Sequence, residues 1–378
     1  MDYLEQARGH APEWEILREA IHRQPELGNQ EYHTAALVEQ RLQSFGIRTE
    51  RLLDTAVVGT LDGALPGKCA ALRADLDALP LQETSGAAFA SACPNIAHAC
   101  GHDVHTAAVL GAAELLAANR TQLHGRVKFF FQPDEEGSGG AQRMIAAGCM
   151  QDVDAVFGAH VCPDLPFGTV GIRYGKFYAA SDTFTIRITG RSCHGAQPEC
   201  GIDALACAAE LVTALHALQS PDSFVLSVGT LSAGTAINVI AGQAELTGIL
   251  RTLGAENRAE MKQAIRKTAE AVCAQFGASA EVTLHESYMG VVNSERETAL
   301  VERSATALLG AEHVKLLDAP TMTTEDFGYF IDAAAGSFYH IGVGGSYPLH
   351  HPSFLPPAEA VPLAAALHAA VVTRFLQD

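Results

Sequence analysis

A cysteine and two histidines lie within five residues of one another in segment 98–103, which reads HACGHD. The segment comes just before a stretch with helical character. Thiolate and imidazole are donors that suit zinc and the transition metals near it. Polar residues at such a place could instead cap the helix, so this segment alone leaves both interpretations open.

Three acidic residues follow an apolar, strand-like run at 127–131. They lie in segment 133–137, which reads PDEEG. An acidic triplet is usually a solvated turn, but like charges at the end of a buried strand repel each other unless a cation holds them. One carboxylate could then bind metal while its neighbour acts as a general base.

Two further histidines follow strand-like or loop segments, His160 in GAHV and His350 in LHHP. A lone histidine is more often a structural residue than a ligand. Together, however, the four segments offer Cys, His, Glu and His on four separate loops. That set suits a two-metal hydrolase, in which the ions polarise a carbonyl and lower the pKa of a bridging water to roughly 7.

The elements around these segments alternate between strands and amphipathic helices. Because such alternation builds a mostly parallel sheet with helices on both faces, we predict an α/β catalytic domain. Functional residues of such sheets lie on loops at the carboxyl ends of strands. The expected helices are 3–45, interrupted at 25–28, and 105–118, and the expected strands are 57–61, 69–73 and 126–132.

The middle of the chain has a different pattern. Residues 181–189 (SDTFTIRIT) alternate apolar and polar side chains, as antiparallel strands do. The order of elements from there is β-α-β-β-α-β, the ferredoxin-like split motif. We therefore predict an α+β domain at 181–292, inserted between the two parts of a catalytic domain at 1–180 and 293–378.

Composition excludes several classes of protein. A net charge of −18 disfavours nucleic-acid partners, which need a basic surface. The apolar run at 364–372 is too short to span a membrane and is interrupted by His368, and the first residues lack the pattern of a signal peptide. Nine scattered cysteines form no disulfide framework, so we expect free thiols in the cytoplasm.

The motifs, taken in order, resemble the aminoacylase-type zinc metallopeptidase family. The nearest branch is that of the amidohydrolases, which includes hippurate hydrolases, N-acyl-L-amino-acid amidohydrolases and auxin-conjugate hydrolases. The resemblance implies a zinc-peptidase-like catalytic domain with an inserted lid or dimerisation domain. It rests on HRQPELGNQE (22–31), RADLDALP (73–80), HACGHDVHT (98–106), PDEEGSGGA (133–141), GAHV (158–161), CHGAQPECGIDA (193–204), INVI (237–240), TEDFGYF (324–330) and HHP (350–352).

The resemblance implies two divalent metal ions per subunit, zinc or manganese, with cobalt or nickel as further possibilities. Cys100 stands in the place of a bridging ligand, where most other branches have Asp. The remaining implied ligands are His102, Glu136, His160 and His350. His351 is adjacent to a ligand position, but the family does not require histidine there, so it is interpreted as a non-ligand.

The resemblance also assigns the acid–base roles. Glu135 would be the general base and later the proton donor, and Asp75 would orient a metal ligand. Many relatives have a metal-binding histidine two residues before that aspartate. Arg73 occupies the position here, as is usual for this branch, so the resemblance implies that His102 binds the metal instead.

In the inserted domain, His194 matches a histidine that polarises the substrate carbonyl or stabilises the oxyanion, in some relatives from the partner subunit. Asn238 and Arg251 match positions that hold the substrate carboxylate, although Arg251 could equally be a surface residue at a strand end. Two features depart from the family pattern: Cys193 replaces the usual alanine, and Glu199–Cys200 replaces the commoner sequence at that point.

The expected activity is hydrolysis of the amide bond in small N-acyl amino acids, such as acetyl or benzoyl derivatives, to a carboxylic acid and a free amino acid. A homodimer or higher homo-oligomer through the lid is expected. Three alternatives stay open: a dipeptidase or aminopeptidase of the same superfamily, a non-catalytic binding protein on this fold, and a redox-sensing thiol protein centred on Cys100.

Overall fold

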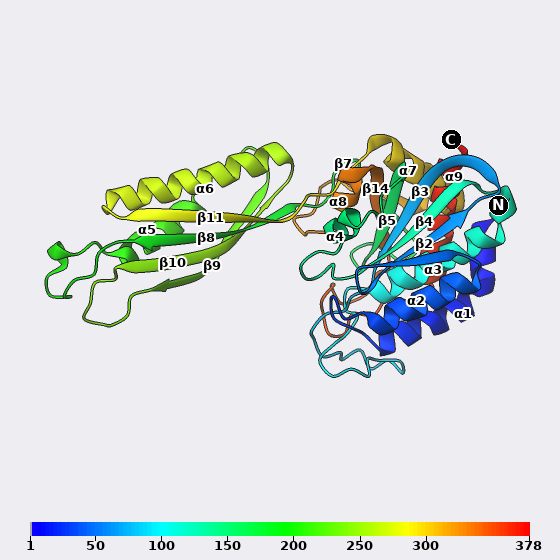
Figure 1. Ribbon diagram of the computed structural model, residues 1–378, viewed down its shortest axis with the longest axis horizontal. Coiled ribbons are helices and arrows are strands. Elements are labelled where there is room, and N and C mark those ends of the chain that lie inside the picture. The colour runs from blue at the N-terminus through cyan, green and yellow to red at the C-terminus, as the bar shows by residue number, and fades with distance from the viewer. Residues whose placement is uncertain (1) are drawn as a thin grey trace. The chain divides into compact units, whose positions relative to one another are not determined.

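The computed structural model describes residues 2–378, which divide into two compact units (Figure 1). The first unit comprises the chain up to Phe177 together with Val292–Ala319 and Asp326–Asp378. The second comprises Tyr178–Val291 and the short segment Pro320–Glu325. This last segment lies outside the insertion predicted at 181–292. The lid or dimerisation role assigned to the second unit stays a prediction.

The first unit is built on an eight-stranded sheet whose four central strands, β4, β3, β5 and β14, run parallel. Its order is β1-β2-β4-β3-β5-β14-β6-β13. The β3–β4, β3–β5 and β5–β14 pairs are parallel, as predicted for a mostly parallel sheet, whereas β1 and β2 form an antiparallel edge. The strands are β1 (Arg48–Leu52), β2 (Ala56–Asp62), β3 (Leu65–Asp75), β4 (His124–Gln132), β5 (Ala155–Cys162), β6 (Val170–Ile172), β13 (Val314–Leu316) and β14 (Ala335–Gly342).

Helices cover both faces of this sheet, as the alternating pattern predicted. Along β4, Phe129 and Phe131 point into the main core, while the ring of Phe130 packs against Phe330 at a centroid distance of 5.6 Å. Helices α1 (Tyr3–Arg23), α2 (Tyr32–Ser44), α3 (His102–Ala118), α7 (Glu295–Leu309) and α9 (Ala360–Gln377) contribute to the main core, and α4 (Ala141–Ala146) and α8 (Gly328–Ala333) contact each other.

Helix α9 is long and apolar enough to cross a membrane, and it is the one such helix within residues 2–378. Of its 18 residues, 78% are buried inside the protein. It contacts α1, α3, α7 and strands of the central sheet. This burial is the environment of a core helix.

The second unit is a four-stranded antiparallel sheet with helices packed on it. The strand order is β11-β8-β10-β9, and the elements follow one another along the chain as β-α-β-β-α-β. The predicted period of two holds in β8, where Phe184, Ile186 and Ile188 are buried. The elements are β8 (Ala180–Thr189), α5 (Ala204–His216), β9 (Phe224–Ala233), β10 (Gln243–Thr252), α6 (Ala255–Gln275) and β11 (Ser279–Tyr288).

Helix α3 begins three residues earlier than the sequence pattern predicted. It starts at His102, and Gly101 precedes it with a left-handed backbone, φ 89°. A side chain at Gly101 would place its Cβ 2.4 Å from Cγ2 of Val161 in β5. Glycine therefore lets the loop pass close to the end of β5 and places His102 in the first helical turn.

Candidate metal centre

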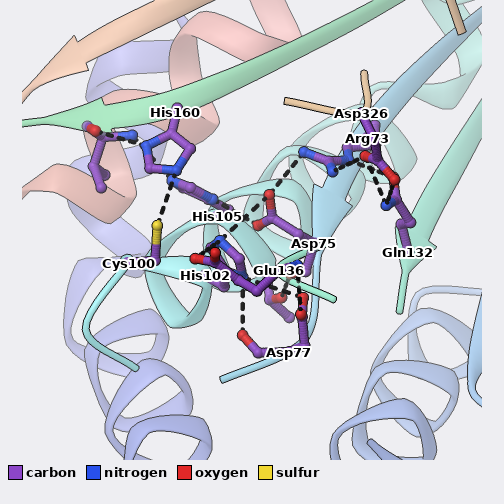
Figure 2. Close-up of polar contacts among 12 residues, drawn as sticks. Arg73, Asp75, Asp77, Cys100, His102, His105, Gln132, Glu136, His160 and Asp326 are labelled. Carbon is purple, nitrogen blue, oxygen red and sulfur yellow. Dashed lines mark hydrogen bonds and ion pairs between the residues drawn. The ribbon is translucent and has the colours of Figure 1, made fainter. Parts of the chain in front are cut away.

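The four chemistry-bearing segments of the sequence meet at one edge of the central sheet. Figure 2 shows three of them, through Cys100 and His102, Glu136, and His160. Asp75 is the last residue of β3, and the acidic segment 133–137 follows β4 directly. His160 lies near the end of β5, and Cys100 and His102 lie where α3 begins. Because β3, β4 and β5 are parallel, their carboxyl ends share this edge, and the predicted ligands converge there.

The five predicted ligands form overlapping groups of donor atoms. Cys100, His102 and His160 are one group, and Cys100, Glu136 and His350 are another, with the donor atoms of each group within 4.8 Å of one another. The Cys100 sulfur lies 3.4 Å from Nε2 of His160, and Nε2 of His350 lies 3.0 Å from Oε1 of Glu136. Cys100 belongs to both groups, the arrangement expected of a shared ligand.

The donor atoms fit divalent cations. Nε2 of His102 is buried without a hydrogen-bond partner among the described residues, and it lies 4.0 Å from Oε1 of Glu136. Leaving a buried polar atom unpaired costs about 1–3 kcal/mol, a cost that a bound cation would remove. Sulfur, imidazole nitrogen and carboxylate oxygen together suit zinc and its neighbours.

The electrostatic environment of the site also favours a bound cation. Burial raises the pKa of the Cys100 thiol, and the nearby Glu136 and Glu135 carboxylates raise it further. Burial lowers the pKa of His102, but Asp75, Asp77 and Glu136 outweigh it and raise that pKa to about 10. Carboxylates that favour a proton at this point also favour a metal ion in its place, and a cation would stabilise the thiolate.

Backbone carbonyl groups select the ring nitrogens that face the cluster. Nδ1 of His102 donates to the carbonyl oxygen of Asp77 at 2.8 Å, and Nδ1 of His160 donates to that of Val161 at 2.7 Å. Each histidine therefore presents Nε2 to the cluster. Such partners fix the tautomer and the orientation of a ligand histidine.

Glu135 and Glu136 turn toward the cluster, whereas Asp134 does not. The donor atoms of His102, Glu135 and Glu136 lie within 4.8 Å of one another, and Glu135 is buried. The Asp134 carboxylate instead accepts hydrogen bonds from Asn29, at 2.7 Å, and from Ser138. Asp134 has a left-handed backbone, φ 58°, which turns the chain between these side chains.

A buried ion-pair network supports Asp75 from behind. Arg73 donates from Nη1 to Asp75 at 2.7 Å and from Nη2 to Asp326 at 3.0 Å. Its Nε donates to the side-chain oxygen of Gln132 at 2.9 Å. Burial raises the pKa of Asp75, but His102, His105 and Arg73 outweigh it and hold that pKa well below its usual range. Sequence reasoning identified Arg73 but not its pairing with Asp326, a residue 253 positions away.

His105 and Asp77 are positioning residues that the sequence analysis did not assign. His105 donates from Nδ1 to Asp75 at 2.7 Å and accepts at Nε2 from the backbone amide of Val161 at 3.0 Å. Asp77 accepts from the backbone amide of Glu136 at 2.9 Å. The i, i+3 spacing of His102 and His105 on one helix is the sequence signal that could have revealed the first of these roles.

The two adjacent histidines near the C-terminus differ in their surroundings. His350 joins the cluster from a left-handed backbone, φ 64°, and its side chain is about half exposed. The ring of His351 stacks on Tyr347 at 4.4 Å, and its Nδ1 accepts from the backbone amide of Ser353 at 3.0 Å. These partners are compatible with the interpretation of His351 as a non-ligand.

The remaining predicted residues belong to the second unit. His194 lies on an exposed loop, and the amide of the next residue, Gly195, donates to the carbonyl of Asn238 at 2.8 Å. Arg251 is half-buried on β10 and donates to the carbonyl oxygen of Met322 at 3.1 Å and to Oγ1 of Thr324 at 3.4 Å. Its guanidinium is therefore held by segment 320–325 rather than freely exposed. Substrate contacts for these three residues stay predictions.

The chain is similar to a known protein family and to several of its characterised members. The profile of a family described as Peptidase family M20/M25/M40 matches residues 71–374. An N-acyl-L-amino acid amidohydrolase from Geobacillus stearothermophilus is 42% identical over 283 residues, 73% of this chain and 76% of that protein. An N-acetyl-L-cysteine deacetylase from Bacillus subtilis is 37% identical over 345 residues, covering 89% and 82%.

Two more similarities cover nearly the whole chain. A protein named thermostable carboxypeptidase 2, from Saccharolobus solfataricus, is 36% identical over 394 residues, covering 99% of each chain. The crystal structure of a Bacillus subtilis protein, described as a dinuclear metal-binding peptidase of this family, superposes with a TM-score of 0.90. It is 33% identical, with 98% and 99% of the two chains covered.

Proposed function

The chain belongs to Peptidase family M20/M25/M40, and we propose that its substrates are small N-acyl amino acids. It is a metal-dependent amidohydrolase that cleaves the bond between the acyl group and the amino-acid nitrogen, giving a carboxylic acid and a free amino acid. The observation that supports this proposal is the pair of donor groups that share Cys100, formed with His102, Glu136, His160 and His350, and the buried Glu135 beside His102 and Glu136.

Two divalent ions would be held by the donor groups described above, and a dinuclear metal-binding relative supports that number. Cys100 is the shared ligand in our proposal, His102 and His160 supply imidazole, and Glu136 and His350 complete the set. When bound, the ions polarise the scissile carbonyl and lower the pKa of water. Zinc or manganese is the proposed metal, because the donors combine soft and hard character.

Glu135 is proposed to move the proton. Its carboxylate takes a proton from the attacking water and then delivers it to the leaving amide nitrogen. The turn that carries Glu135 is fixed on both sides. The backbone amide of Asp134 donates to Glu31 at 2.9 Å, and that of Glu136 donates to Asp77 at 2.9 Å. A base held in this way needs little reorganisation during the reaction.

The second unit is proposed to bind the remainder of the substrate. His194 would stabilise the developing negative charge on the carbonyl oxygen, and Asn238 and Arg251 would hold the α-carboxylate. We propose that this unit also joins subunits into a homodimer or a higher homo-oligomer. The whole protein would act in the cytoplasm on small soluble substrates.

A carboxypeptidase is the second candidate, favoured by the relative that matches 99% of the chain. It would cleave the same kind of bond beside the same free carboxylate, so the metal ligands and Glu135 would be unchanged. A dipeptidase or aminopeptidase would also need an acid to hold a free α-amine. The amidohydrolase and the carboxypeptidase differ only in what lies on the acyl side of the scissile bond.

One experiment separates these candidates. The protein is stripped with a chelator, refilled with zinc or manganese, and assayed for amino-acid release from N-acetyl and N-benzoyl amino acids, free dipeptides and N-blocked dipeptides. We expect activity to disappear with the metal, return with it, and be highest on N-acyl amino acids. Preference for peptides would replace the proposed substrate class. Failure to bind metal would overturn the assignment of the ligands themselves.

A further inference from the structure

Two cysteines border the exposed loop that carries His194. We call residues 193–200, CHGAQPEC, the His194 loop. Cys193 is partly buried and Cys200 is exposed, and both lie in the second unit. Both stand at the positions that depart from the usual family pattern, as noted above.

The base of the His194 loop is held by backbone hydrogen bonds on both sides. Arg191 and Ile202 exchange two such bonds, at 3.0 and 2.9 Å, as an antiparallel pair. On the other side, the amide of Ile240 donates to the carbonyl of Cys193 at 2.9 Å. The chain therefore enters and leaves the loop at adjacent points, with Cys193 on one arm and Cys200 on the other.

A single carbonyl group brings the two cysteines together. The thiol of Cys193 donates to the carbonyl oxygen of Gln197 at 3.2 Å, and the amide of Cys200 donates to the same oxygen at 3.0 Å. The Cys193 sulfur and the Cys200 backbone nitrogen therefore share one acceptor oxygen. Gly201 makes room for it, since a Cβ there would lie 2.7 Å from that sulfur. A disulfide needs Cα atoms about 4.4–6.8 Å apart, a range that opposite arms of one narrow loop can meet.

We propose that Cys193 and Cys200 form a reversible disulfide across the base of the His194 loop, and that this oxidation lowers turnover. The oxidant is a small-molecule disulfide such as oxidised glutathione. The exposed Cys200 thiolate attacks it and releases one glutathione thiol. Cys193 then attacks the Cys200 sulfur of the mixed disulfide and releases the second. Two electrons pass from the protein thiols to the oxidant, and the two thiol protons end on the released glutathione.

The properties of the two thiols suit this order of attack. Partial burial raises the pKa of Cys193, and the neighbouring Cys200 and Glu199 raise it further. Since the thiolate is the nucleophile, Cys193 is the slower group toward an external oxidant and suits the second, intramolecular step. The other close pair, Cys207 and Cys273, has sulfur atoms 3.4 Å apart but is buried in the core of the second unit.

Formation of the disulfide would affect His194 through the turn that orients its ring. Nδ1 of His194 accepts from the amide of Ala196 at 3.1 Å, and its carbonyl accepts from the amide of Gln197 at 2.8 Å. A disulfide removes the thiol donor to the Gln197 carbonyl and links the two arms covalently. The His194 ring would lose the freedom to adjust to a substrate. The effect on turnover, unlike the disulfide, rests on the proposed function.

The test uses the full chain, reduced, freed of reductant and then treated with oxidised glutathione. Endoproteinase Glu-C cuts after Glu199, so it separates the two cysteines unless they are linked. We expect a linked Glu-C peptide pair in the wild type, a loss of about 2 Da in intact mass for the two hydrogens removed, and reversal by dithiothreitol. Cys200→Ser should give no link, and Cys207→Ser, the matched control at the buried pair, should keep it.

Turnover is measured on the same samples. We expect oxidised wild type to lose turnover relative to the reduced protein, because the motions of active-site loops set many turnover rates, and Cys200→Ser to keep most of its activity under the same treatment. A stable glutathione adduct on Cys200 without a disulfide to Cys193, or a disulfide to Cys207 instead, would disprove the proposed Cys193–Cys200 disulfide. A complete link with unchanged turnover would overturn the effect on activity. If reduced protein cleaves no N-acyl amino acid, the proposed function fails, while the peptide map still decides the disulfide.

Discussion

The imidazole of His105 accepts a hydrogen bond at Nε2 from the backbone amide of Val161, at a distance of 3.0 Å. Its other nitrogen donates to Asp75 at 2.7 Å, and its ring lies 4.5 Å from that of His160. One side chain from α3 therefore connects the end of β3 to the end of β5. Movement of any of these elements would move a proposed metal ligand.

His105 should accordingly control metal affinity without binding metal. Replacing it with alanine is expected to weaken binding by about 10–100-fold, the usual effect of removing a group that supports a ligand. Metal titration of the apoprotein by calorimetry would measure the change, with turnover at saturating metal as a second readout. His33→Ala, at an exposed histidine on α2, is the matched control. Wild-type metal affinity in the His105 variant would remove the positioning role.

Glu135→Ala should abolish most turnover while leaving the metal in place. A general base contributes about 10²–10⁴-fold to rate, so we expect a loss of at least that order in kcat. Metal content by mass spectrometry should stay at the wild-type level because the other donors remain. A variant whose kcat stays within about tenfold of wild type, a change of about 1.4 kcal/mol in activation free energy, would mean that another group moves the proton.

Arg73→Met should destabilise the first unit strongly. Arg73 is 1% exposed and pairs with two buried carboxylates, Asp75 and Asp326. Removing one partner of a buried ion pair leaves uncompensated charge and costs about 3–5 kcal/mol. The free energy of unfolding from denaturant titration would measure this loss. Arg126→Met breaks an ion pair with Asp62 that is about 40% exposed, so it should cost about 1 kcal/mol or less. Equal losses in both variants would contradict the assigned burial.

Stability should depend on pH through His22, which packs between two carboxylates. Burial lowers the pKa of His22, and Arg18 lowers it as well, but Asp103 and Glu83 outweigh both and raise it from 6.5 to about 9. Because the folded pKa lies above the unfolded one, the stabilisation is full below about pH 6.5 and is lost as pH rises toward 9. Its size is on the order of 3 kcal/mol.

The check is the difference in unfolding free energy between wild type and His22→Gln across this range. The difference should be largest near pH 6 and shrink steadily toward pH 9.5. A difference that grows with pH would reverse the sign of the argument. Glu83 reports on the same contact at low pH. Burial raises its pKa, but His22, Ser85 and Ser91 lower it to about 2, so its contribution is lost as pH falls from 4.5 toward 2.

Local patterns in the sequence predicted much of the fold. The alternation in β8 and the apolar run of β4 each determine which side chains are buried, and both were recognisable from a few neighbouring residues. The start of α3 was placed too late because Gly101 acts through its left-handed backbone and its contact with Val161, which no local pattern reveals. The return of segment 320–325 to the second unit is likewise a tertiary property, marked by its contact with Arg251.

The site divides in the same way. Segments 98–103 and 133–137 could be proposed to bind metal because ligand-capable residues cluster there near element ends, and the family resemblance then implied Cys100, His102 and Glu136 as the ligands. The network behind them could not, because Arg73 meets Asp326 only through the folding of distant parts of the chain. The role of His105 depends equally on the end of β5 lying beside α3. Sequence shows which groups can do chemistry, whereas packing decides which groups hold them.

The place of β14 in the sheet has a consequence for synthesis of the protein. β14 pairs with β5 so that Ala335 lies opposite Ala155, yet the entire second unit is encoded between these strands. At about 5–20 residues per second on the ribosome, β14 emerges on the order of 10–40 s after β5. For that interval the strand bearing His160 has an open edge, and the nascent chain lacks His350, one of the proposed metal ligands. Mismetallation and edge-to-edge aggregation are thus hazards of the newborn chain, and the time taken to translate the insertion sets how long they last.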